Sequence, residues 1–237
     1  MIEIKGLSKS FGKKPVVENV SLTIQPKAIT SFIGPNGAGK STLLSMVSRL
    51  LDSDTGEVFL DKNDVKKMKS NDFAKRVAIL RQSNHLNVRL TVRELVAFGR
   101  YPYSKGRLTA EDEEHIDRAI EYMTLGEMEH KFLDELSGGQ KQLLNLASIM
   151  AMQPSVLILD EPTSQLDPIA ASDFLNTVRK INRELRTTII ITEHRLEYIV
   201  YASDRVIVME DGKVIANDRP ENIGEFLKGE NNQMFVA

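Results

Sequence analysis

The chain has 237 residues, of which 41% are hydrophobic and 27% are charged, with a formal net charge of −2 at pH 7 and no cysteine. This composition supports a sizeable core and excludes disulfides and cysteine-based metal sites, while the small net charge disfavours nucleic-acid binding by bulk electrostatics. No run approaches 18 apolar residues and the first residues lack an apolar signal-peptide core, so we expect a cytoplasmic protein.

Short runs rich in β-branched residues alternate with segments of helical periodicity. We expect strands at residues 21–24, 29–33, 57–61, 76–80, 156–160, 187–192, 205–210 and 213–216. The runs at 156–160 and 187–192 are apolar throughout, which is typical of parallel strands covered on both faces. Asp211 and Gly212 separate the last two strands and predict a tight antiparallel hairpin.

Strand signals almost vanish between Gln82 and Gln153. Segments 91–100, 110–123 and 138–152 instead repeat apolar residues at helical spacing. The pattern therefore predicts one α/β domain whose core, at residues 1–82 and 153–237, carries an inserted helical subdomain at residues 83–152. The expected sheet is mainly parallel with an antiparallel part at its edge and near the N-terminus.

The stretch "GPNGAGKST" fits the phosphate-loop pattern G-x-x-x-x-G-K-[ST], with a predicted strand before it and a predicted helix after it. Gly37 and Gly39 permit positive φ, so that backbone N–H groups can turn toward phosphate oxygens. Lys40 adds a positive charge and Ser41 a hydroxyl ligand for Mg²⁺. We therefore expect a nucleoside triphosphate site formed by Gly34, Asn36, Gly37, Gly39, Lys40, Ser41 and Thr42.

Two adjacent carboxylates lie at the end of the apolar run "VLILD": Asp160 is its last residue and Glu161 follows it. Asp160 is expected to hold Mg²⁺ through water, and Glu161 to orient or deprotonate the attacking water. The alternative, that the pair merely caps a helix, is weaker because no helical pattern follows at once. Kinases, GTPases and transport ATPases all share a phosphate loop, so these residues alone do not choose among them.

The motif "LSGGQ" at residues 136–140 separates those classes. Ser137, Gly138, Gly139 and Gln140 open a predicted helix, and a helix N-terminus favours anions. A chain with a complete phosphate loop has little use for a second anion site, unless two copies pair head to tail and each motif contacts the γ-phosphate held by the other. A plain helix start remains the alternative, and a small-molecule kinase is disfavoured.

With these motifs, nearly the whole chain resembles the ATP-binding cassette (ABC) family. The resemblance implies that Phe11 stacks on adenine, that Gln82 contacts Mg²⁺ and the attacking water, and that Asp167 in "SQLD" lies at the dimer interface. It also implies that His194 contacts the γ-phosphate and that ATP and Mg²⁺ are the cofactors. Structural roles for Phe11, Gln82 and His194 remain alternatives at this stage.

The finer resemblance changes along the chain. Residues 1–136 are similar to cassettes of bacterial iron–siderophore importers, notably in "LTVRELVAFGRYPY", whereas residues 137–237 are similar to those of energy-coupling-factor importers for vitamins or metal ions. The change favours a chimera joined between Leu136 and Gln140, with a natural intermediate subfamily as the alternative.

The resemblance implies an ATPase that powers import, with iron–siderophore as the first cargo and a vitamin or metal ion as the second. Implied partners are a second copy or related cassette and a membrane permease, with the chain peripheral at the inner face of the membrane. A soluble cassette in translation or DNA repair is disfavoured by the single cassette, the low charge and the lack of a heptad repeat. Intact Lys40, Asp160, Glu161 and His194 argue against a module that holds ATP without hydrolysing it.

Overall fold

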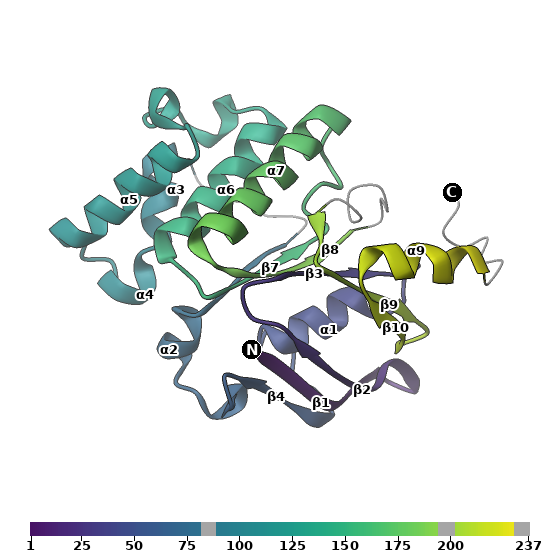
Figure 1. Cartoon of the computed structure of the whole chain (residues 1–237). Coiled ribbons are helices and arrows are strands. Elements are labelled where there is room, and N and C mark those ends of the chain that lie inside the picture. The colour runs from purple at the N-terminus through teal and green to yellow at the C-terminus, as the bar shows by residue number, and fades with distance from the viewer. Residues whose placement is uncertain (82–88, 194–201, 230–237) are drawn as a thin grey trace.

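The computed structural model describes residues 1–81, 89–193 and 202–229, and shows an α/β fold with two sheets and a group of helices (Figure 1). The larger sheet has six strands. Their spatial order is β10 (Lys213–Asp218), β9 (Arg205–Glu210), β3 (Ile29–Ile33), β8 (Thr188–Thr192), β7 (Val156–Asp160) and β6 (Val77–Leu80). All neighbours are parallel except β9 and β10.

The predicted hairpin between β9 and β10 is confirmed. Asp211 and Gly212 both have positive φ, 45° and 78°, as a two-residue hairpin turn with the right twist requires. Strands 29–33, 156–160 and 205–210 match their predicted limits. The other five differ at their ends. β6 and β8 each begin one residue later than predicted, and β10 extends two residues further. The strands expected at 21–24 and 57–61 begin earlier, at Lys14 and Thr55.

The smaller, antiparallel sheet has the order β2 (Lys14–Ile24), β1 (Ile2–Phe11), β4 (Thr55–Leu60) and β5 (Asn63–Asp64). Strands β1 and β5 have no counterpart in the sequence prediction. The register of β1 against β2 shifts three times after Ile4, and Gly6 has a φ of 59°. These irregularities break the alternation of apolar and polar residues by which a strand is recognised.

Helix α1 (Lys40–Val47) lies between the two sheets, and a second group of helices covers the other face of the six-stranded sheet (Figure 1). Strand β7 shows the consequence residue by residue. Val156 and Ile158 belong to the core around α1, whereas Leu157 and Leu159 belong to the core under the helices. This two-sided burial explains the unbroken apolar run of β7.

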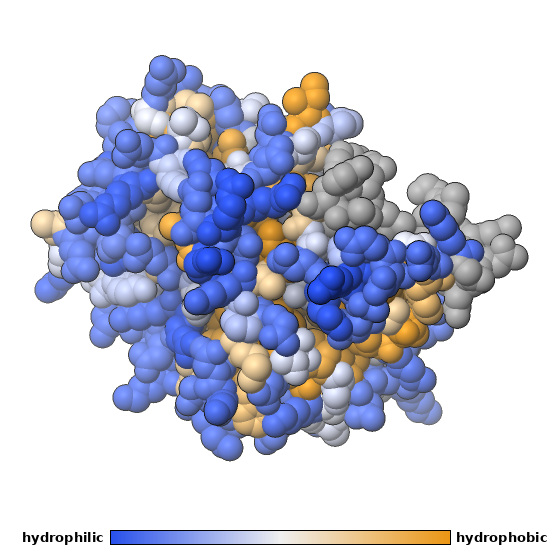
Figure 2. Space-filling model, viewed as in Figure 1, coloured by the Kyte–Doolittle hydropathy of each residue, from blue (hydrophilic) through white to orange (hydrophobic). Residues whose placement is uncertain are grey.

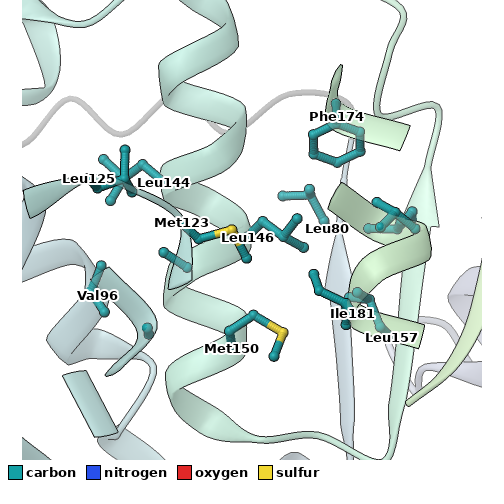
Figure 3. Packing of buried hydrophobic residues seen from close by; sticks show 14 of the residues in the cluster. Leu80, Val96, Met123, Leu125, Leu144, Leu146, Met150, Leu157, Phe174 and Ile181 are labelled. Carbon is teal, nitrogen blue, oxygen red and sulfur yellow. The ribbon is translucent and has the colours of Figure 1, made fainter. Parts of the chain in front are cut away.

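Those covering helices are α3 (Val92–Phe98), α4 (Tyr101–Ser104), α5 (Ala110–Tyr122), α6 (Gly138–Met152) and α7 (Pro168–Leu185). Their shared core joins Leu144 and Leu146 of α6 to Val96, Phe174 and the sheet residue Leu80 (Figure 3). Helices are therefore confirmed in all three predicted segments, while the division into a core and a helical subdomain at residues 83 and 152 stays a prediction.

The remaining helices are short or lie at the edges: α2 (Ser70–Ala74) precedes β6, and α9 (Pro220–Gly229) packs on β9 and β10. In Figure 2 most of the visible face is hydrophilic, and apolar colour gathers where β9, β10 and α9 meet. None of the helices within the described ranges is long and apolar enough to cross a membrane.

Candidate functional site

The phosphate loop follows the central strand β3 and leads into α1, as the sequence predicted. Gly34, Gly37 and Gly39 have φ values of 148°, 83° and 94°. A Cβ atom at Gly34 would lie 2.0 Å from Met209 O, and one at Gly39 would lie 2.4 Å from Val16 O. Neither position can hold a side chain, so the neighbouring strands force the loop into a tight curve, a conformation that can turn backbone N–H groups toward a phosphate.

Lys40, the first residue of α1, folds back over this loop. Its side chain is 5% exposed, and Nζ donates hydrogen bonds to Gly34 O at 2.7 Å and to Pro35 O at 3.0 Å. Burial lowers the pKa of the ammonium group, and the charges of Glu161 and Asp160 act in the opposite direction. The loop therefore holds a buried cation at the N-terminus of a helix, a combination that suits a phosphate group.

A hydroxyl–carboxylate group lies beside the loop. Ser41 Oγ and Thr192 Oγ1 both donate to Asp160 Oδ1, at 2.9 Å and 2.8 Å. Asp160 ends β7 and Thr192 ends β8, and the two residues are paired in the sheet. Oxygen donors of this kind are the ones Mg²⁺ prefers, so the residues present fit a nucleotide-bound magnesium ion.

Glu161 directly follows β7 with a φ of 48°, an uncommon conformation for a residue with a side chain. Its backbone N–H donates to Thr192 Oγ1 at 2.9 Å and to Thr192 O at 3.2 Å. These main-chain bonds fix the turn at the end of the strand. The negative charge of Glu161 raises the pKa of Lys40, against the effect of burial, so the two charges lie near enough to interact.

Sequence reasoning missed Thr192 and Glu193. Thr192 anchors both Asp160 and the Glu161 backbone, while Glu193, only 3% exposed, accepts from Thr163 N at 3.2 Å and Thr163 Oγ1 at 2.7 Å. The available signal was the polar end of "IIITEH", where the polar residues Thr192 and Glu193 stand just before the histidine. Gln82 and His194, both predicted to contact the nucleotide, lie outside the described residues.

Ser137 and Gln140 form a reciprocal cap at the start of α6. Ser137 Oγ accepts from Gln140 N at 3.3 Å, and Gln140 Oε1 accepts from Ser137 N at 2.9 Å. A Cβ atom at Gly138 would have open space around it, and one at Gly139 would lie 3.4 Å from Ala170 Cβ. Over the described residues, the hydrogen bonds of Ser137 and Gln140 satisfy the start of α6 itself.

Asp167 and Phe11 lie at the ends of other elements. The Asp167 carboxylate caps α7, because Oδ1 accepts from Ile169 N and Ala170 N, each at 3.0 Å. Ile169 beside it is 77% exposed. Phe11 ends β1 with 54% of its side chain exposed, and Lys9 Nζ lies 5.8 Å from the ring centre. Its exposure leaves the ring available to stack against a ligand.

The sequence model of the family "ABC transporter" matches residues 17–164, a span that contains the phosphate loop, the "LSGGQ" motif, Asp160 and Glu161. The chain belongs to the ABC transporter family. Members are ATPases that bind nucleotide, and this chain is an ABC ATPase cassette. The predicted family and P-loop fold are thus confirmed.

Two curated relatives resemble this cassette along most of its length. The petrobactin import ATP-binding protein YclP of Bacillus subtilis (strain 168) is 43% identical over 225 residues, which cover 95% of this chain and 89% of that protein. The iron(3+)-hydroxamate import ATP-binding protein FhuC of the same strain is 37% identical over 211 residues, covering 88% and 78%. The match to YclP crosses residues 136–140, but an identity averaged over 225 residues does not compare the two halves, so the chimera stays a prediction.

A solved structure shares the cassette's fold. It is the dimeric structure of a post-hydrolysis state of the ATP-binding cassette MJ0796 bound to ADP and Pi, 25% identical, with a TM-score of 0.80 and coverage of 93% of this chain and 99% of that one. That protein therefore provides a dimeric, nucleotide-bound example of the same architecture.

Proposed function

We propose that this chain is the ATP-hydrolysing subunit of a bacterial importer for iron–siderophore complexes. The observation that carries the proposal is the convergence of Lys40, Asp160 and Glu161 on the loop between β3 and α1, beside the Ser41 and Thr192 hydroxyls. The cargo class rests on the relatives, because YclP is named for petrobactin import and FhuC for iron(3+)-hydroxamate import.

The phosphate loop holds ATP through its backbone N–H groups and the Lys40 ammonium group. Ser41 and Asp160 hold Mg²⁺, which supplies charge neutralisation for the β- and γ-phosphates. Glu161 orients or deprotonates the attacking water. Gln82, which also contacts the metal, and His194, which senses the γ-phosphate, complete the proposed site from outside the described residues.

Two copies, or this chain and a related cassette, bind ATP between them in head-to-tail order. Two features support this arrangement: Ile169 beside Asp167 is exposed, and the similar cassette MJ0796 is dimeric. ATP then joins the loop of one copy to the signature residues of the other, so binding favours the closed dimer and hydrolysis releases it.

A membrane permease is the second proposed partner, and it places the cassette at the inner face of the membrane. Large exposed side chains gather where α3 and α4 meet: Phe98 is 57% exposed, Tyr101 60% and Tyr103 38%. Exposed aromatic residues in one segment are typical of a protein interface. Energy-coupling-factor import of a vitamin or metal ion is the alternative role, and reconstitution with a siderophore permease distinguishes the two.

The dimer is tested with Glu161→Gln, which is expected to bind ATP without hydrolysing it. Sedimentation should show a monomer without nucleotide and a dimer with Mg-ATP, because unhydrolysed γ-phosphate bridges the two copies. Mg-ADP serves as the control and should leave the monomer unchanged. A chain that binds ATP and still sediments as a monomer would contradict dimerisation of the isolated cassette.

Phe11→Ala tests the adenine contact. We expect ATP affinity to fall by roughly 1–3 kcal/mol, the usual value of a base–aromatic stack. Inorganic triphosphate lacks a base, so its affinity should not change and it provides the control ligand. Equal losses for ATP and triphosphate, measured by calorimetry, would instead indicate damage to the phosphate loop.

A further inference from the structure

The corner between α3 and α4 contains a buried charge pair that the proposed nucleotide chemistry does not use. Arg100 and Asp112 are each 3% exposed, and Arg100 Nε donates to Asp112 Oδ1 at 2.8 Å. Asp112 Oδ2 accepts from Thr109 N at 3.0 Å and from Thr109 Oγ1 at 2.8 Å. The bond from Thr109 N, followed by those from Arg100 and Thr109 Oγ1, holds the pKa of Asp112 below its usual range.

Buried ion pairs contribute little net stability, because desolvation offsets the attraction between the charges. Their geometry is therefore more informative than their energy. Arg100 Nη1 donates to Ala151 O at 2.9 Å, and Tyr103 Oη donates to Met152 O at 3.1 Å. The Arg100 guanidinium lies 4.0 Å from the centre of the Tyr103 ring.

Ala151 and Met152 are the last two residues of α6, and carbonyls in a final helical turn have no donor within the helix. Arg100 and Tyr103 supply those donors from another part of the chain. The positive charge of Arg100 also faces the negative end of the α6 dipole. The α3–α4 corner thus caps the C-terminus of α6.

The corner approaches α6 very closely because residue 99 is glycine. A Cβ atom at Gly99 would lie 1.9 Å from Ser148 O, so backbone packs directly on backbone. The same short segment exposes Phe98 and Tyr101, its permease-facing residues in the proposed function. Gly99 and Arg100 of this segment therefore pack on α6, while the exposed Phe98 and Tyr101 can contact a partner.

The opposite end of α6 carries Ser137. With 15 residues at about 1.5 Å each, α6 is roughly 22 Å long. Leu144, Leu146 and Ala147 are fully buried along it, and Figure 3 shows the first two packed within the shared helical core. A helix held this way turns as one body, so a change in direction at its C-terminus moves its N-terminus.

We propose that Arg100, supported by Asp112 and Tyr103, is a positioning residue that sets the direction of α6 and thereby presents Ser137 to the nucleotide held by the partner copy. This inference rests on the proposed function, because it assigns α6 the signature role. The network connects the exposed Phe98–Tyr101 side of the corner to the nucleotide interface at the far end of the helix. Loss of the network leaves the phosphate loop intact and impairs dimer closure.

The test introduces Arg100→Lys and, separately, the milder Tyr103→Phe into the Glu161→Gln background. Arg93→Lys is the matched control: Arg93 lies on α3, just before the corner, and pairs with Glu113, Asp117 and Glu129, none of which belongs to α6. Sedimentation over a range of Mg-ATP concentrations measures dimer closure. Calorimetry measures ATP affinity, and amide hydrogen exchange of the nucleotide-free monomer reports on residues 138–145.

We expect Arg100→Lys to raise the Mg-ATP concentration for half-dimerisation roughly tenfold, a coupling of ordinary size. Tyr103→Phe should raise it by a smaller factor, about threefold, and neither variant should change ATP affinity. Arg93→Lys should dimerise at the same Mg-ATP concentration as the parent Glu161→Gln variant. If both test variants close like Arg93→Lys, the proposal is overturned, even where their unfolding midpoints fall. If Arg100→Lys does not fold, dimer closure by Tyr103→Phe alone tests the proposal.

If the parent Glu161→Gln variant binds ATP but stays monomeric, the proposed dimer of isolated cassettes is contradicted. That result does not test the positioning role of Arg100. Hydrogen exchange then decides the inference. Faster exchange at residues 138–145 in Arg100→Lys or Tyr103→Phe than in Arg93→Lys supports positioning of α6 by the corner, and equal exchange overturns it.

Discussion

Glu161→Gln should lower ATP turnover by a factor of at least roughly 10², the usual contribution of a positioned general base. Glutamine has the same length as glutamate but neither its charge nor its basicity. The backbone N–H of residue 161 donates to Thr192, and glutamine at this position keeps those main-chain bonds. Phosphate release at saturating Mg-ATP measures the loss, and calorimetry should show that ATP still binds.

Glu18→Gln is a suitable control for the loss of one glutamate charge. Glu18 pairs with Lys213 on the surface, and its side chain is 39% exposed. ATP turnover by the Glu18→Gln variant should equal that of the unmodified chain. Full turnover by Glu161→Gln would exclude Glu161 as the base or water-orienting group, whereas loss of ATP binding would show that its charge mainly maintains the phosphate loop.

The strands of the six-stranded sheet were largely predictable because each has an unmistakable local cause. β7 and β8 are covered on both faces, so each contains an unbroken apolar run, Val156–Leu159 and Ile189–Ile191. The Asp211–Gly212 turn predicts the antiparallel pair that it joins. β1 was missed for the opposite reason. Its bulges and Gly6 disturb the alternation, and only its pairing with β2 and β4 makes it a strand.

The parts of the site likewise differ in whether a local sequence pattern or long-range strand pairing determines them. The phosphate loop is contiguous in sequence, and its glycine and lysine spacing follows directly from the shape of a bound phosphate. The role of Thr192 depends on pairing between neighbouring strands, which sets it beside Asp160, 32 positions earlier. No local pattern contains that register, so Thr192 and the buried Glu193 became apparent only in three dimensions.

The "LSGGQ" motif was predictable as a helix start, and the structure shows how its side chains satisfy that role. Ser137 and Gln140 bond to each other's backbone N–H groups. A partner nucleotide would therefore meet a preformed helix terminus. Its contact with the partner's γ-phosphate stays a prediction, as do the roles of Gln82 and His194.

Lys40→Ala should weaken Mg-ATP binding by roughly ten- to a hundredfold or more. The loss of a charge-assisted hydrogen bond accounts for about 1.5–3 kcal/mol, and each 1.4 kcal/mol corresponds to a factor of ten. A second effect adds to it: Gly34 O and Pro35 O lose the donor that draws the loop around the site. Titration calorimetry with Mg-ATP measures the affinity.

Lys213→Ala is the matched control, because Lys213 carries the same charge on the surface, where its side chain is 62% exposed. It should bind Mg-ATP as the unmodified chain does, which separates a local effect of Lys40 from a change in net charge. Alanine is well tolerated in the first turn of a helix, so α1 should persist and the unfolding midpoint should report this. Unchanged affinity in a folded Lys40→Ala variant would mean that the backbone N–H groups and the α1 dipole hold the phosphates without the ammonium group.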